Sequence, residues 1–79
     1  MYYIYVLRSL KNKRFYTGST EDLSRRLDEH NSGRSKATKY ARPFELIYQE
    51  TFDSRSEALR REKELKTGKG REELKAKLV

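Results

Sequence analysis

The sequence predicts an α+β domain of the wider α/β class, built on a three-stranded antiparallel sheet with flanking helices in the order β-β-α-β-α-α. Three short runs of β-branched and aromatic residues alternate with the period of two that strands show. Only a few polar residues separate the first two runs, as in a hairpin. The other segments have leucines four apart and capping residues at their starts, which are typical of helices.

The first two strands are expected within residues 2–18, joined by a polar connection that contains Asn12. Side chains of a strand point alternately to opposite faces of the sheet. The two faces of the first strand would consist of Tyr3, Tyr5 and Leu7 and of Tyr2, Ile4 and Val6. Neither set is polar, so we expect this strand to lie in the centre of the sheet.

The first helix is expected from about Glu21 to Asn31. Ser19 and Thr20 are candidate N-caps, and the two acidic residues that follow suit a first turn, where the helix dipole favours negative charge. The Asn-Ser-Gly run at the other end can terminate the helix. Arg26 and His30 are four residues apart and share one shoulder of the leucine stripe, where a cleft could form.

The second half of the chain predicts one more strand and two helices. The strand is expected from Phe44 to Phe52, with Phe44, Leu46 and Tyr48 on one face. A Ser-x-x-Glu capping box at residues 54–57 opens a helix to about Thr67 that Gly68 can end. A last short helical segment would follow Gly70.

Length and composition limit the class of protein. With 79 residues, 34% of them hydrophobic, we expect a single domain over residues 1–79 whose small core depends on its aromatic residues. The absence of cysteine excludes disulfides and thiolate metal sites. No apolar run approaches the roughly 20 residues that span a bilayer, and no signal peptide precedes the first strand, so a cytoplasmic location and no membrane association are expected.

The net charge of +7 predicts attraction to polyanions, of which nucleic acid is the expected one. An anionic membrane is the weaker alternative, because the basic residues do not line one amphipathic helix, and a solvated basic surface without a partner is the other. The loop of residues 33–43 interleaves four cations with one tyrosine, a pattern that can follow a phosphate backbone and stack on a base. A short helical turn can form within this loop. The candidates for nucleic-acid contact are Arg25, Arg34, Lys36, Lys39, Tyr40, Arg42 and Lys66.

Glu62 is a carboxylate in an unusual place. Helical geometry puts it on the apolar stripe that Ala58, Leu59 and Leu65 form. A carboxylate there is costly unless it is paired, hydrogen-bonded or bound to a cation. Its partner could be Arg26, a tyrosine hydroxyl or a divalent metal. A buried ionic or hydrogen-bonded pair without chemistry stays open on the residue pattern alone.

The tyrosines of the hairpin resemble a known pair of motifs. Tyr3-Ile4-Tyr5 and Tyr16-Thr17-Gly18 are similar to the two tripeptides that name the GIY-YIG nuclease superfamily, and the eleven-residue step from Tyr5 to Tyr16 is the expected one. The sequence departs from the pattern in three places. Tyr3 replaces the first glycine, Thr17 replaces the second isoleucine, and Ser19 replaces a lysine that follows the glycine in some relatives.

The resemblance extends over almost the whole chain. Arg26 matches the family's arginine on the first helix, and Glu62 matches its metal-binding glutamate. His30-Asn31 and the run at residues 63–66 look like the small, single-domain bacterial branch. Four elements in order and at the right spacing make the resemblance specific, although each tripeptide alone would be weak.

The resemblance implies roles for five residues. Glu62 would hold one Mg²⁺ or Mn²⁺, largely through waters, and Arg26 would brace the phosphate. Tyr5 or Tyr16 would take the proton of the attacking water, and His30 could relay it. Judged singly, the tyrosines could only pack the sheet, His30 could only complement a helix dipole, and Arg26 could be a surface charge. All five must meet around one solvent-reachable hollow.

The implied function is a metal-dependent endonuclease that hydrolyses phosphodiester bonds in DNA, or in RNA, directed by shape more than by sequence. The alternative is a nucleic-acid-binding module of the same fold with little or no catalytic activity. A third candidate is an adaptor whose basic face binds an acidic protein. Nucleic acid, DNA foremost, is the expected partner, a repair or recombination protein is a second one, and the chain would be a monomer or a weak dimer.

Overall fold

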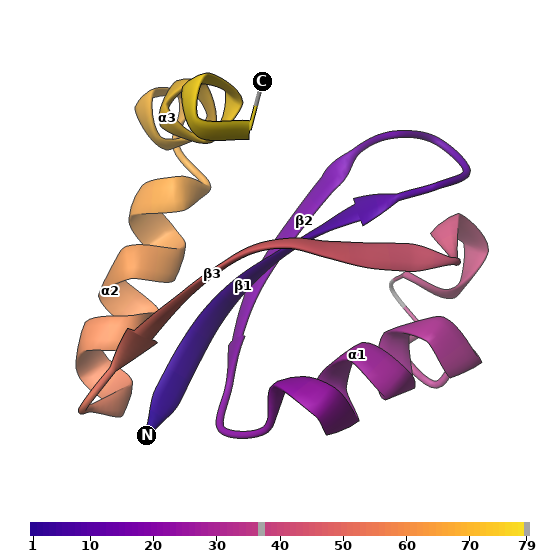
Figure 1. Ribbon diagram of the computed structural model, residues 1–79, viewed down its shortest axis with the longest axis horizontal. Coiled ribbons are helices and arrows are strands. Elements are labelled where there is room, and N and C mark those ends of the chain that lie inside the picture. The colour runs from indigo at the N-terminus through magenta and orange to yellow at the C-terminus, as the bar shows by residue number, and fades with distance from the viewer. Residues whose placement is uncertain (37, 79) are drawn as a thin grey trace.

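The computed structural model describes residues 1–36 and 38–78 of the chain. An antiparallel sheet of three strands forms its centre, which confirms the predicted fold class and element order. The strands are β1 (Tyr2–Ser9), β2 (Phe15–Thr20) and β3 (Phe44–Phe52), and the helices are α1 (Leu23–Ser32), α2 (Arg55–Leu65) and α3 (Gly68–Leu78), with a 3-10 turn η1 (Lys39–Ala41) before β3. The strand order β2-β1-β3 leaves β2 at an edge of the sheet (Figure 1).

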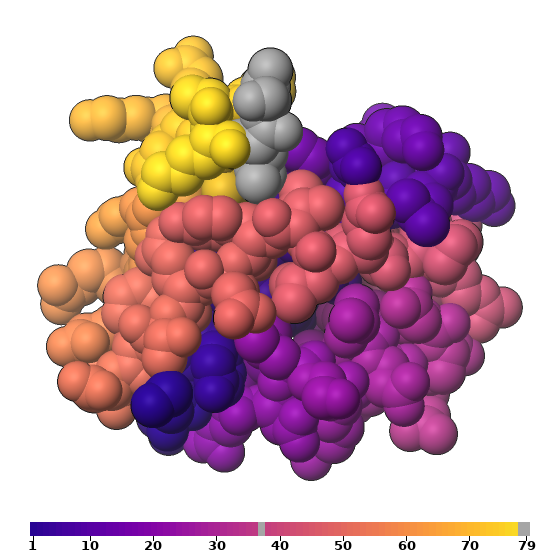
Figure 2. Space-filling model, in the orientation of Figure 1, coloured from indigo at the N-terminus to yellow at the C-terminus, as the bar shows by residue number. Residues whose placement is uncertain are grey.

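β1 is buried on both faces, as its two apolar faces predict. One core cluster consists of Ile4, Val6, Ala58, Leu65 and Leu74, and the other consists of Tyr5, Leu7, Ala41 and Phe44. The leucines of α1 pack against the second cluster, so α1 covers one face of the sheet while α2 and α3 cover the other. In the space-filling view, β3 and α1 hide the middle of β1 (Figure 2).

β3 has the predicted bounds but not the predicted alternation. A bulge opposite Val6 and Leu7 shifts the register, because Val6 pairs with Tyr48 while Leu7 pairs with Leu46. The residue left over is Ile47, and beyond it the strand has changed faces. Phe44 and Tyr48 therefore pack in different clusters, and the prediction that Tyr48 shares a face with Phe44 and Leu46 is wrong.

α1 begins two residues later than predicted. Ser19 and Thr20 are not its N-caps, since both still pair with β1 as the last residues of β2. The cap is Asp22, whose Oδ1 accepts a hydrogen bond of 3.0 Å from the backbone N–H of Arg25. The predicted end of the helix is confirmed, because Gly33 closes it with a φ of 82° that favours glycine.

The C-terminal helices also meet at a different point from the one predicted. The predicted cap is present, because Ser54 accepts from the backbone of Glu57. α2 ends at Leu65 and α3 already begins at Gly68, so that glycine starts a helix instead of ending one. Gly70 lies in the first turn of α3, where a Cβ would come within 2.5 Å of the Leu65 Cα. Glycine is therefore required for α3 to pack this closely on the end of α2.

The loop that enters β3 is fixed from α1. The Asn31 side chain accepts from the backbone N–H of Phe44 at 2.7 Å and donates to its carbonyl at 3.3 Å. The predicted helical turn in this loop is η1. Within the described ranges, the structure has no helix long and apolar enough to cross a membrane.

Candidate active site at the free edge of the sheet

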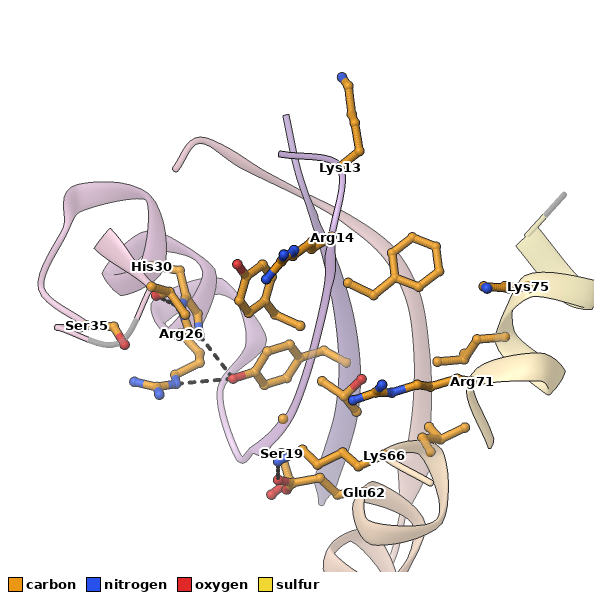
Figure 3. Close-up of a pocket in the computed structure, with 18 of the residues that line it drawn as sticks. Lys13, Arg14, Ser19, Arg26, His30, Ser35, Glu62, Lys66, Arg71 and Lys75 are labelled. Carbon is orange, nitrogen blue, oxygen red and sulfur yellow. Dashed lines mark hydrogen bonds and ion pairs between the residues drawn. The ribbon is translucent and has the colours of Figure 1, made fainter. Parts of the chain in front are cut away.

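A hollow of about 980 Å³ crosses the free edge of the sheet at β2. α1 and the loop after it bound one side, and α2 with α3 bounds the other (Figure 3). The residues to which the sequence assigned catalytic roles all line it, and they are Tyr5, Tyr16, Arg26, His30 and Glu62. The first four belong to the face that α1 covers, and Glu62 comes from α2 on the opposite face. The two groups share a hollow because β2, an edge strand, has no further strand beside it, so the hollow reaches both faces of the sheet there.

The Tyr5 hydroxyl is held from two sides. Arg26 Nε donates to it over 3.3 Å, and His30 Nε2 lies 3.1 Å from it. The other ring nitrogen of His30, Nδ1, is 2.8 Å from the Thr38 hydroxyl. His30 and Thr38 are buried, at 5% and 8% exposure. These contacts form a continuous chain of polar groups that leads from the hollow into the loop after α1. Figure 3 draws the contacts of Arg26 and His30 with the phenol as dashed lines.

Gly18 explains why the second tripeptide ends in glycine. It lies opposite Tyr5 in the β1–β2 register. A Cβ at this position would overlap the Tyr5 hydroxyl and lie 2.6 Å from Cζ of its ring. Any other residue would therefore push the phenol out of its contacts with Arg26 and His30.

The electrostatics of this group follow from burial and from one cation. Burial lowers the pKa of His30, and the adjacent Arg26 charge lowers it further, against a smaller opposing effect of Glu29. The hydrogen bond to Tyr5 raises the pKa of Arg26. At neutral pH the site therefore contains a neutral imidazole and a permanent guanidinium, both in contact with one phenol.

Tyr16 has different surroundings from Tyr5. Its hydroxyl accepts a hydrogen bond of 3.2 Å from Asn12 Nδ2, and its ring packs edge-on against Phe44. Its hydroxyl also raises the pKa of the neighbouring Tyr40, a side chain that is 60% exposed. Tyr16 thus belongs to the rim of the hollow, beside an aromatic surface that faces solvent.

Glu62 is paired with a cation that the sequence did not suggest. Its Oε2 accepts from Nζ of Lys66, the C-cap of α2, at 2.7 Å, and not from Arg26 or a tyrosine, two of the three candidate partners. The third candidate, a divalent metal, stays a prediction. Ala58 and Leu65 flank it in the core, but Leu59 is 39% exposed and does not belong to the apolar face. The Glu62 side chain keeps 18% of its area exposed, toward the hollow.

This carboxylate fits one hard divalent cation. Mg²⁺ commonly keeps several waters and takes one or two carboxylates together with a substrate phosphate. Among the described residues there is no cluster of three or more histidine, cysteine, aspartate or glutamate side chains that could hold a metal without such help. Of the described acidic side chains, Glu62 is the one that lines the hollow, and Ser19 lies near it (Figure 3).

The cations of the hollow differ from those chosen on sequence. Of the predicted nucleic-acid contacts, Tyr40 and Lys66 line it, whereas Arg25, Arg34, Lys36, Lys39 and Arg42 are exposed outside it. Four cations that were not chosen also line it, namely Lys13, Arg14, Arg71 and Lys75. Thr38 was missed as well. The sequence did contain a signal for the two cations of α3. Arg71, Leu74 and Lys75 have the spacing i, i+3, i+4, which places both cations on one helical face beside a leucine that packs in the core.

Comparison with known proteins identifies the family of the chain. Residues 1–75 match the family described as the GIY-YIG catalytic domain. A UPF0213 protein of Staphylococcus saprophyticus is 45% identical over 75 residues, which are 94% of this chain and 90% of that protein. A UPF0213 protein of Staphylococcus haemolyticus is 44% identical over the same shares. The solution NMR structure of the UPF0213 protein BH0048 from Bacillus halodurans has a TM-score of 0.57 and 38% identity, covering 96% of this chain and 84% of that one.

Proposed function

The chain belongs to the GIY-YIG family of catalytic domains, and from that premise we propose that it is a metal-dependent endonuclease acting on DNA, with RNA as the second candidate. The family implies chemistry of the nuclease type. The observation that carries the proposal is the Tyr5 hydroxyl, which Arg26 and His30 hold in a hollow that also contains the carboxylate of Glu62.

Tyr5 is the better candidate for the general base. Its oxygen accepts from Arg26, so its own hydrogen is free to point at His30 Nε2. Because His30 is neutral, it carries one N–H, and donation of that N–H to Thr38 leaves Nε2 as an acceptor. Tyr5 can then take the proton of an attacking water while it passes its own to His30. Among the hydrogen bonds of the described residues, the Tyr16 hydroxyl has neither an arginine donor nor a histidine acceptor, and accepts from Asn12 instead.

Arg26 would act on the phosphate as well as on Tyr5. Its Nε donates a hydrogen bond to the Tyr5 hydroxyl. Its Nη1 lies 3.7 Å from Glu29 Oε1, which is a loose ion pair at the surface. The side chain is 37% exposed, toward the hollow. A guanidinium fixed in this way can stabilise the negative charge that develops on the phosphate oxygens, without having to reorganise during the reaction.

Glu62 is the residue that would hold the metal, and a bound Mg²⁺ or Mn²⁺ supplies positive charge to the phosphate and to the leaving oxygen. In the structure Lys66 neutralises this carboxylate. The Lys66 side chain is long, flexible and 53% exposed. Because an exposed ion pair contributes little free energy, its ammonium can leave Glu62 at a small cost in stability. Once released, it would add to the cations that face the substrate.

Affinity would come mainly from phosphate contacts. The cations of the hollow would contact phosphates, which carry no sequence information, so recognition would depend on the shape of the nucleic acid or on a partner from repair or recombination. Binding should then fall steeply with salt, by about one power of the salt concentration for each phosphate neutralised.

Incubation of supercoiled, branched and single-stranded DNA with Mg²⁺ or Mn²⁺ tests the proposal. The parent chain should cut at least one of them, and Tyr5→Phe, Arg26→Ala and Glu62→Gln should each lose the activity. A contaminating nuclease would be indifferent to these changes. If the parent binds DNA but none of the substrates is cut, the chain is a binding module, an outcome that the Glu62–Lys66 pair makes worth testing.

A further inference from the structure

The hollow concentrates positive charge far beyond the chain average. The chain has 19 lysine and arginine residues and 12 acidic ones. Of the side chains that the structure describes, six cations and one carboxylate line the hollow, namely Lys13, Arg14, Arg26, Lys66, Arg71 and Lys75, and Glu62. Like charges gathered in one concave surface repel one another, and a polyanion that enters relieves this repulsion. Two of the six come from α3, a helix to which the proposed chemistry assigns no task.

The direction in which these two side chains point is set by the packing of α3. Leu74, between them on the helix, is buried in the core cluster of β1 and α2. Glu73 pairs with Arg61, which also binds Glu50 of β3 at 2.9 Å. One side of α3 is thus bound to both α2 and β3, and the side chains of Arg71 and Lys75 extend from it toward the strands (Figure 3).

Arg71 and Lys75 also differ from the other cations near them in what they contact. Lys77 pairs with Glu73 and lies over the ring of Tyr48, and Lys66 pairs with Glu62. Among the residues that the structure describes, neither Arg71 nor Lys75 has an acidic partner. They are exposed, positively charged and held on a helix that the core fixes in place.

We propose that α3 is a second phosphate-binding wall, in which Arg71 and Lys75 hold the nucleic-acid backbone beside the phosphate that is cut. This inference rests on the proposed function. α1 would hold the reacting phosphate through Arg26, and α3 would hold its neighbours on the far side of β2. The bound strand therefore crosses the free edge of the sheet, from the hairpin cations Lys13 and Arg14 to α3.

The salt dependence of binding tests the role of α3. Affinity for a labelled DNA oligonucleotide, as a single strand and as a duplex, is measured without divalent ions so that the DNA stays intact. For the duplex, the slope of log affinity against log salt should become shallower by about two in the double variant Arg71→Ala/Lys75→Ala. The matched control is Arg60→Ala/Lys63→Ala, which removes one arginine and one lysine from exposed positions of α2 outside the hollow. It should leave the slope unchanged.

The outcomes separate this inference from the proposed function. Equal slopes for the α3 variant and the parent, with the parent binding DNA, would overturn the inference alone. Failure of the parent to bind either form of DNA would overturn both. A second measurement does not depend on substitutions: bound DNA should protect Lys75 from acetylation and leave Lys63 reactive, and equal modification of the two would count against the proposal.

Discussion

The two walls of the hollow are built in different ways. On the α1 wall, Tyr5, Arg26, His30 and Thr38 form one chain of hydrogen bonds, and His30 and Thr38 are almost fully buried. On the other wall, Lys66, Arg71 and Lys75 are exposed, and among the described residues only Lys66 of these three is paired with a group of the hollow. The first arrangement is rigid before any substrate arrives. The second can adjust to what it binds.

The difference in hydrogen bonding and exposure indicates which step of the reaction each wall supports. Proton transfer and charge stabilisation depend on atoms that are positioned in advance, and small displacements reduce them strongly. Contacts to phosphates depend mainly on charge and tolerate motion. We therefore expect changes on the α1 wall to lower the cleavage rate more than the affinity, and changes on the α3 wall to do the opposite.

The largest effect should come from Arg26→Ala. Loss of the guanidinium removes the cation from both Tyr5 and the phosphate, and removal of one such group commonly lowers the rate by about 10²–10³. Arg25→Ala is the matched control, because Arg25 is the adjacent residue of α1 but lies outside the hollow. The measurement is single-turnover cleavage at saturating enzyme. Similar rates for the two variants would remove Arg26 from the chemistry.

Stability should depend on the residue that anchors α3. Leu74→Ala should lower the free energy of unfolding by about 2–5 kcal/mol, since Leu74 is 1% exposed in the core. Leu59→Ala, at a position that is 39% exposed, should cost clearly less. Urea unfolding followed by circular dichroism compares the two. Equal losses would mean that the core does not fix α3 in place.

Thr38→Val should lower the cleavage rate about tenfold, an effect of the size expected when a buried hydrogen bond is lost. The methyl group keeps the shape of the side chain but leaves His30 Nδ1 without its partner. Thr51→Val, at an exposed position of β3, is the control. Nitrogen chemical shifts of the imidazole, measured by NMR, should show a changed tautomer in the first variant. An unchanged tautomer would contradict a positioning role of Thr38.

The smallest effect is a loss of stability in mild acid. Burial lowers the pKa of His30 in the folded chain, so the unfolded chain, in which a histidine has a pKa of about 6.5, binds this proton more readily. The stability that neutral His30 contributes is present above that pH and is lost as the pH falls through the folded-state pKa. Urea unfolding of the parent and of His30→Gln measures it. The titratable and charged groups that face the His30 ring are Arg26, Glu29 and Tyr5. If the stability of the variant falls as steeply with pH as that of the parent, His30 is not the group that titrates.

Sequence reasoning succeeded where one residue pattern decides the structure. The two apolar faces of β1 predict its central position, and Ser54 predicts the start of α2. The spacing of the two tripeptides predicted the family, which the match over residues 1–75 confirms. In each case the signal is local, or depends on a fixed separation along the chain.

The errors came from competition between elements and from tertiary contacts. Thr20 can cap a helix, but it pairs with Tyr3 of β1 as the last residue of β2, so Asp22 caps α1 instead. Gly68 can end a helix, but α3 starts there because Gly70 lets it pack on α2. The loop of residues 33–43 contains four cations, and none of them lines the hollow. Four of the six cations that do line it come from the hairpin and α3, since only the fold decides which charges face one another.

The central claim is that residues from opposite faces of the sheet act in one reaction. A double-mutant cycle of Tyr5→Phe and Glu62→Gln tests it, with single-turnover cleavage as the measurement and Glu57→Gln, an exposed glutamate of the same helix, as the control. Residues that act as a unit are far from additive, so the double variant should cleave within about tenfold of the slower single variant. Unchanged cleavage by Glu62→Gln, or losses that simply multiply, would contradict the claim.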